Sequence, residues 1–186
     1  MSHVQVGSRR LAVDFFSYTH RISTQFAIRG GRPLMDTLND HTLSYIDLDI
    51  AYVSRIDKPG ELIADYAISI LRKENISFCL IAAQTEMAVK TVPSAQYFAR
   101  RSRQVFCTVP SFEITGMIDV PGNVDLHKMM AIGVERFMPI YKATATISLL
   151  QSVTFSGDLI LVNKEAIEVF CIGEAAAATA TTQGSG

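Results

Sequence analysis

Two stretches of this 186-residue chain match each other without a gap, and they decide its fold. Residues 21–53 read RISTQFAIRGGRPLMDTLNDHTLSYIDLDIAYV, and residues 113–145 read EITGMIDVPGNVDLHKMMAIGVERFMPIYKATA. At this offset of 92 residues the apolar positions and the turn residues coincide, although few residues are identical. With one residue deleted the offset becomes 91, and Lys73–Ile76 then falls on Lys164–Ile167. Self-similarity of this kind indicates that the chain contains an internal duplication.

The duplication predicts two structural units of about 70 residues each. The copies are expected at 9–82 and 101–173, with residues 83–100 as a linker. Residues 174–186 have no periodic apolar pattern and are expected to form a disordered tail.

Alternation of apolar and polar residues predicts five short strands in each copy. Ile22, Phe26 and Ile28 alternate with polar residues, and Ile114, Ile118 and Val120 do so in the second copy. This period of two is typical of a strand with one buried face. The expected strands are Leu11–Tyr18, Arg21–Arg29, Leu43–Val53, Leu62–Leu71 and Ile76–Ile81, and then Gln104–Val109, Phe112–Val120, Arg136–Ile147, Val153–Val162 and Ile167–Ile172.

A short helix is expected after the second strand of each copy. Pro33 suits a first helical turn, and Leu34 and Leu38 form an apolar stripe that Leu126 and Met130 repeat. The predicted fold is mainly β: two tandem five-stranded small β-barrels, each with one short helix, related by a pseudo-twofold axis. The alternative is a single continuous antiparallel sheet or sandwich built from both copies.

One position conflicts with this pattern. Ile50, which is assigned to the inner face of the third strand, aligns with Lys142. Either the alignment or the choice of inner face is therefore wrong at this point.

Composition excludes several classes of protein. Hydrophobic residues make up 48% of the chain and charged residues 19%, which excludes intrinsic disorder. The formal net charge of −1 creates no overall field that would attract nucleic acid or anionic lipid. No secretory signal or transmembrane run is visible, so we expect a cytoplasmic protein without a membrane partner. The three cysteines form no C-x-x-C pair, and we expect no metal or cofactor.

A motif in the first copy resembles that of an uncharacterised bacterial family of small β-barrel domains. It comprises Gly30-Gly31-Arg32-x-Leu34-x-Asp36-x-Leu38-Asn39 and then Tyr45-Ile46-x-Leu48, similar to an R-L-x-D-x-L-N helix followed by an F-I-x-L strand. The second copy keeps the apolar positions but not the polar ones. The stretch Asp158–Ile167 loosely resembles the closing strands of Sm-like barrels. The first resemblance implies a small barrel with no known activity, and the second implies RNA binding or oligomeric rings.

Two polar groups are candidate binding sites. Arg32, Asp36, Asn39 and His41 surround the end of the first helix, where they could orient a small ligand or transfer a proton. The same residue types are common at helix ends and turns for structural reasons. Arginines at the start of each repeat could contact phosphates, although charge clusters often only face water: Arg9, Arg10, Arg100, Arg101 and Arg103.

Three functions are compatible with these features. The first is a non-enzymatic interaction or assembly module whose partner is another protein or a second copy of the chain, because each polar group has a structural explanation. The second is binding of single-stranded nucleic acid, such as RNA, through the arginines. The third is a small-ligand or enzymatic site at the helix end of the first copy; the sequence identifies no catalytic residue.

Overall fold

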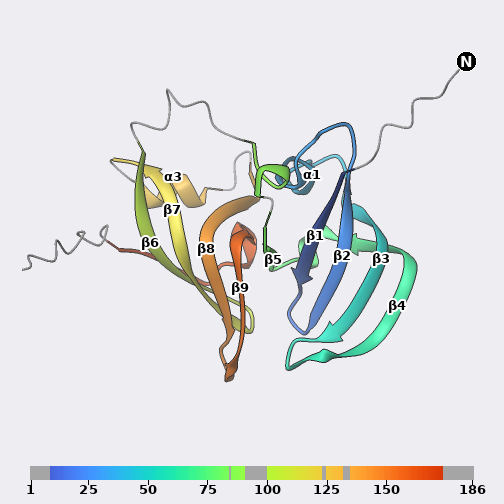
Figure 1. The fold of residues 1–186 in the computed structure, drawn as a ribbon. Helices are drawn as coiled ribbons and strands as arrows, with labels where there is room; N and C mark the ends of the chain where they lie inside the picture. The colour runs from blue at the N-terminus through green and yellow to red at the C-terminus, as the bar shows by residue number, and fades with distance from the viewer. Residues whose placement is uncertain (1–8, 84, 91–99, 123–124, 132–134, 174–186) are drawn as a thin grey trace, which may run out of the picture.

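The computed structural model describes residues 9–83, 85–90, 100–122, 125–131 and 135–173, and all ten of its strands belong to one antiparallel sheet (Figure 1). The order across the sheet is β10-β6-β7-β8-β9-β5-β1-β2-β3-β4. The strands of the first copy are β1 (Arg9–Phe16), β2 (His20–Ile28), β3 (Tyr45–Arg55), β4 (Lys58–Arg72) and β5 (Phe78–Ile81). Those of the second are β6 (Arg100–Val109), β7 (Phe112–Pro121), β8 (Phe137–Ile147), β9 (Leu150–Asn163) and β10 (Val169–Ile172).

The mainly β class is confirmed, and both copies have the same strand order. In each, four consecutive strands form a meander and the fifth strand pairs with the first. The copies are joined where β5 pairs with β9, so the sheet is continuous, as in the alternative architecture. Across the described residues no pairing closes either copy into a separate barrel, because β4 and β10 end the sheet. The junction also joins unlike strands, whereas a twofold axis at that point would join like strands.

Short helices follow the second strand of each copy, as predicted. Helix α1 (Leu34–Leu38) buries its two leucines, and α3 (Leu126–Met130) is capped by Asp125, whose carboxylate accepts a hydrogen bond from the backbone N–H of Lys128. Three short 3₁₀ helices complete the described structure: η1 (Lys73–Asn75), η2 (Thr85–Met87) and η3 (Lys164–Ala166). Within the predicted linker the structure has η2 and the first residue of β6, while residues 91–99 and the predicted tail at 174–186 lie outside the described part.

The conflict at Ile50 is resolved by the backbone. Ile50 has φ 59° and Lys142 has φ 47°, so the left-handed region is occupied at equivalent positions. A left-handed residue interrupts the alternation, and burial passes from Ile46 and Leu48 to Ala51. Ile50 points outward, so the alignment is right and the inner face was wrongly assigned from this residue on.

The two copies accommodate this left-handed residue differently. In the first, the buried Thr24 hydroxyl contacts the carbonyl oxygens of Asp49 and Ile50 at 3.1 and 2.8 Å. In the second, the equivalent residue is Gly116, where an added Cβ would lie 2.9 Å from the carbonyl oxygen of Tyr141. A hydroxyl satisfies the carbonyls in one copy, and a close backbone approach replaces it in the other.

Each copy has its own apolar core, but both cores extend across the junction. The first includes Phe137, Leu159 and Leu161 from the second copy. The second includes Phe16, Phe78 and Leu80 from the first copy. The rings of Phe16 and Phe78 stack with centroids 4.4 Å apart, and both meet Phe112 edge-on. Neither copy therefore buries its apolar residues alone.

Within the described ranges, no helix has the length and apolar character needed to cross a membrane.

Candidate functional site

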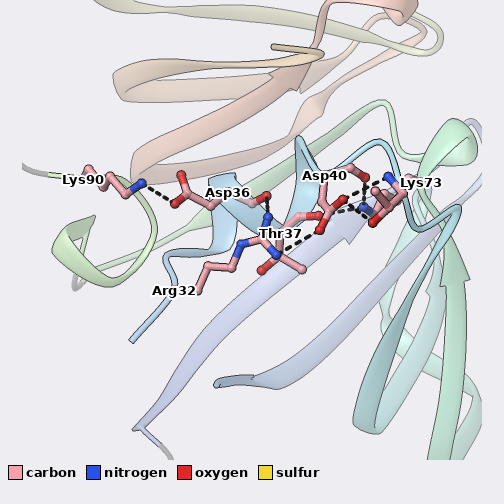
Figure 2. A network of polar contacts seen from close by, with 7 residues as sticks. Arg32, Asp36, Thr37, Asp40, Lys73 and Lys90 are labelled. Atoms are coloured by element: carbon pink, nitrogen blue, oxygen red, sulfur yellow. Dashed lines mark hydrogen bonds and ion pairs between the residues drawn. The ribbon is translucent and has the colours of Figure 1, made fainter. Parts of the chain in front are cut away.

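Two of the four predicted helix-end residues, Arg32 and Asp36, belong to a polar network around α1 that also includes Asp40, Lys73 and Lys90 (Figure 2). The Arg32 guanidinium contacts the Asp40 carboxylate at 2.9 Å and donates to the Asp36 carbonyl oxygen at 2.9 Å. Asp36 pairs with Lys90, with 2.6 Å between Oδ2 and Nζ. Hydrogen bonds from the hydroxyl and the backbone N–H of Thr42, together with Arg32, hold the pKa of Asp40 well below its ordinary value. These side chains order the turn after α1.

A buried lysine donates hydrogen bonds to carbonyl groups at the end of this helix. Lys73 is almost fully buried, and its Nζ donates to the carbonyl oxygens of Thr37 and Asp40 at 2.7 and 2.8 Å. These carbonyls include groups that a helix end leaves without a backbone partner. Burial lowers the pKa of Lys73, because a charged group is disfavoured away from water. Sequence reasoning used Lys73 only to align the repeats and missed this role.

Asn39 connects the two copies. Its side-chain oxygen accepts a hydrogen bond from the N–H of Phe137 at 2.8 Å, and its side-chain nitrogen donates to the carbonyl oxygen of Phe137 at 3.3 Å. The amide thus pairs with β8 as a neighbouring strand would. Asn39 is half-buried in this contact, whereas His41 lies exposed just beyond the helix end. The four predicted residues therefore lie around one turn, and Arg32 and Asn39 have structural partners there.

The arginine groups lie within the first strands of their copies, at equivalent positions. Arg9 pairs with Ile28, and Arg101 pairs with Val120. Four strands separate β1 from β6 in the sheet, so the two groups do not occupy neighbouring strands. Arg10 lies 4.0 Å from the Asp49 carboxylate, which offsets part of its charge. The partly buried Arg103 has no hydrogen-bond partner for its Nε among the described residues.

A cleft of about 740 Å³ brings one residue from each predicted site together. It lies between α1 and the β7–α3 region, and both Asp36 and Arg100 line it. Among the described residues, its charged lining comprises four basic and four acidic residues: Lys90, Arg100, Lys128, Lys164, Asp36, Asp119, Asp125 and Glu135. The charges of these described lining residues therefore sum to zero.

In the described structure, large apolar side chains are exposed along β4, which forms one edge of the sheet. Ile68 is 88% exposed and Ile70 is 66% exposed. Their equivalents in the second copy, Leu159 and Leu161, are fully buried. The difference arises because β9 has β5 beside it, whereas among the described strands β4 has a neighbour on one side only.

The second half of this edge also lacks the usual protection against strand pairing. Between Asp65 and Arg72 the sequence reads Tyr-Ala-Ile-Ser-Ile-Leu, with no charge and no proline. Natural edge strands are commonly interrupted by charged residues, proline or bulges. Sequence reasoning predicted this strand but did not detect that it ends the sheet; its only signal was the apolar pattern that it shares with β9.

The other end of the sheet, β10, is exposed in the same way. Val169 is half exposed and Cys171 is exposed, whereas their equivalents Phe78 and Leu80 are buried at the junction. The thiols elsewhere in the sheet are shielded: burial raises the pKa of Cys79, and raises that of Cys107 to about 12. Cys171 is thus the accessible cysteine of this chain.

Comparison with known proteins gives no relative from which a function could be transferred: no family model, no curated protein and no solved structure matches the chain.

Proposed function

We propose that the chain is a non-enzymatic assembly module that joins protein chains by strand addition at the free β4 edge. In strand addition, backbone hydrogen bonds to an open edge provide affinity, and alternate side chains provide specificity. The observation that carries the proposal is the contrast between the exposed Ile68 and Ile70 and their buried equivalents in β9.

The same contrast supports a proposal about each copy. Each is a barrel-like unit that a strand from a neighbouring copy completes, instead of closing on itself. The first core includes Leu159 and Leu161 from the strand beside β5, which supports this view. A core completed from outside gives the assembly a large part of its driving force, because apolar burial is the main favourable term in association.

The other two functions have less support. At the helix end, Arg32 and Asn39 already make contacts that order the chain. The arginine groups lie on strands far apart in the sheet, and Arg10 faces an aspartate. The β4 edge, in contrast, exposes groups whose equivalents in the same molecule already make a protein contact.

Light scattering coupled to size exclusion, from about 1 to 100 µM protein, tests the proposal. We expect the mass to rise with concentration in the wild type and to stay at one chain in Ile68→Lys/Ile70→Lys. Lysine on a free edge is solvated, but it opposes pairing with an incoming strand.

The control is Leu149→Lys, which introduces one lysine, against two in the double variant, at a residue that is 99% exposed in the turn before β9. This variant should assemble like the wild type, and circular dichroism should give the same sheet content for all three proteins. A wild type that is monomeric throughout, or a double variant that assembles like the control, would refute the proposal.

A further inference from the structure

The junction inside the chain defines how one copy binds the next. In the sheet, β5 of the first copy pairs with β9 of the second, and β9 is the equivalent of β4. The strand left free in the second copy, β10, is the equivalent of β5. The two outer strands of the sheet, β4 and β10, are therefore the equivalents of the two strands that pair at the internal junction, β9 and β5.

We infer that β10 of one chain pairs antiparallel with β4 of a second copy of this chain, repeating the internal junction. This inference rests on the proposed function, because it names the strand that β4 receives. The junction pairs Phe78 with Val162 and Ile81 with Leu159. Transferred by the 91-residue offset, this register places Val169–Ile172 of one chain opposite Ile68–Leu71 of the other.

Side-chain faces agree with this register. At the internal junction Leu159, Leu161, Cys79 and Ile81 all face the first core. By equivalence Ile68 and Ile70 of the incoming strand would face the same way as Phe170 and Ile172, which are partly buried against the second core.

The second core lacks the contribution that the first receives. Phe137, Leu159 and Leu161 enter the first core from the neighbouring copy and are buried there. Their equivalents in the first copy, Tyr45, Ile68 and Ile70, are all exposed. A second chain placed on β10 would supply these three side chains to the second core.

Two differences make the contact between chains smaller than the internal one. Gly157 lies so close to β5 that an added Cβ would be 2.7 Å from the Ile81 carbonyl oxygen, and its equivalent in β4 is Tyr66. The contact must therefore end before Tyr66. Asn39, which binds Phe137 across the junction, corresponds to Ala131, so that side-chain contact is not repeated. The contact between chains is accordingly weaker than the internal junction and reversible.

Because the two edges are unlike, the contact is head-to-tail. A head-to-tail contact gives a closed ring where its rotation closes, and a filament where it does not. In either case each chain uses one β4 and one β10.

Disulfide cross-linking tests the register. Cys171 is exposed, and the register places it opposite Ser69, on the same face, because the equivalent Leu80 and Ile160 share a core. Opposed residues of antiparallel strands have Cα atoms about 4.5–5.5 Å apart, within the range that a disulfide spans. Ser69→Cys should therefore form covalent multimers on mild oxidation, and dithiothreitol should dissolve them.

Mixing two proteins that each carry one accessible thiol limits the cross-linked product to a dimer. Ser69→Cys/Cys171→Ser carries the introduced thiol on β4 alone, and the wild type carries its accessible thiol on β10. An equimolar mixture should give covalent dimers that stop at two chains, and neither protein alone should give them. The off-register control, Asp65→Cys/Cys171→Ser, moves the thiol four residues along the strand, about 13 Å. It should give at least tenfold less dimer.

The outcomes separate this inference from the proposed function. Cross-linking of Ser69→Cys/Cys171→Ser to itself would mean that β4 pairs with β4, which overturns the inference and leaves the assembly function standing. Equal cross-linking at Asp65 and Ser69 would overturn the register. Assembly that is insensitive to Ile68→Lys/Ile70→Lys would overturn the proposed function itself.

Discussion

Asn39→Ala should destabilise the whole sheet, because it removes two side-chain hydrogen bonds between the two copies. The two hydrogen bonds to Phe137, at 2.8 and 3.3 Å, contribute about 1 kcal/mol each. The expected loss is therefore about 2 kcal/mol. For a chain of this length, that loss lowers the melting temperature by about 4–8 °C.

Thermal and urea denaturation, followed by circular dichroism at a concentration where the protein is monomeric, measure this loss. The matched control is Asn75→Ala, at an exposed asparagine in η1, which should stay within about 0.5 kcal/mol of the wild type. An Asn39→Ala protein as stable as this control would refute the reasoning that the amide fastens the copies together. It would also reopen a ligand-binding role for Asn39.

Three further changes test the packing. Gly157→Ala should lower the free energy of unfolding, measured by urea denaturation, by about 1–3 kcal/mol, because its Cβ would press on the Ile81 carbonyl oxygen. Gly60→Ala, with open space around it, should be close to neutral. Equal effects of the two substitutions would contradict the close approach at Gly157. Thr24→Val should cost about 1–2 kcal/mol, because two carbonyl oxygens of β3 lose the hydroxyl; an unchanged urea midpoint would contradict this. Because burial lowers the pKa of Lys73 below its ordinary 10.5, the folded state binds fewer protons than the unfolded state, and stability attributable to this residue should rise with pH in the window below 10.5. Lys73→Met should remove that rise, measured as the difference between wild-type and variant urea midpoints from pH 8 to 11, and a difference that is constant with pH would contradict it.

Local patterns predicted the strands and short helices well, because each depends on a few neighbouring residues. The alternation around Ile22 and Phe26 corresponds to β2, and the leucines after Pro33 correspond to α1. The outward turn of Ile50 was not predictable in the same way, because the pattern expresses periodicity and not a left-handed backbone. Its alignment with Lys142 was the only sign, since a charged residue at an equivalent position argues against burial.

Local sequence patterns did not predict the contacts between residues that lie far apart in the chain. Asn39 contacts a backbone 98 residues further along the chain, and its sequence neighbourhood suggests only a helix end. The choice between closed barrels and one sheet depends on whether β5 pairs with β4 or with β9. Both partners are apolar strands of similar sequence, so composition alone does not distinguish them. The exposed β4 edge follows from that pairing, and for this reason it was not identified as a candidate site.

The junction also has a consequence for how the chain folds. The meanders pair strands that are close in sequence, whereas Asn163 and Ile76, which meet at the junction, lie 87 residues apart. Contacts of high sequence separation form late, because the intervening chain must be closed into a loop first. Until then β5 and β9 are open as well as β4 and β10, and each open edge can accept the wrong counterpart from another chain. Refolding at high concentration should therefore produce strand-swapped species, and slow dilution should favour pairing within the chain.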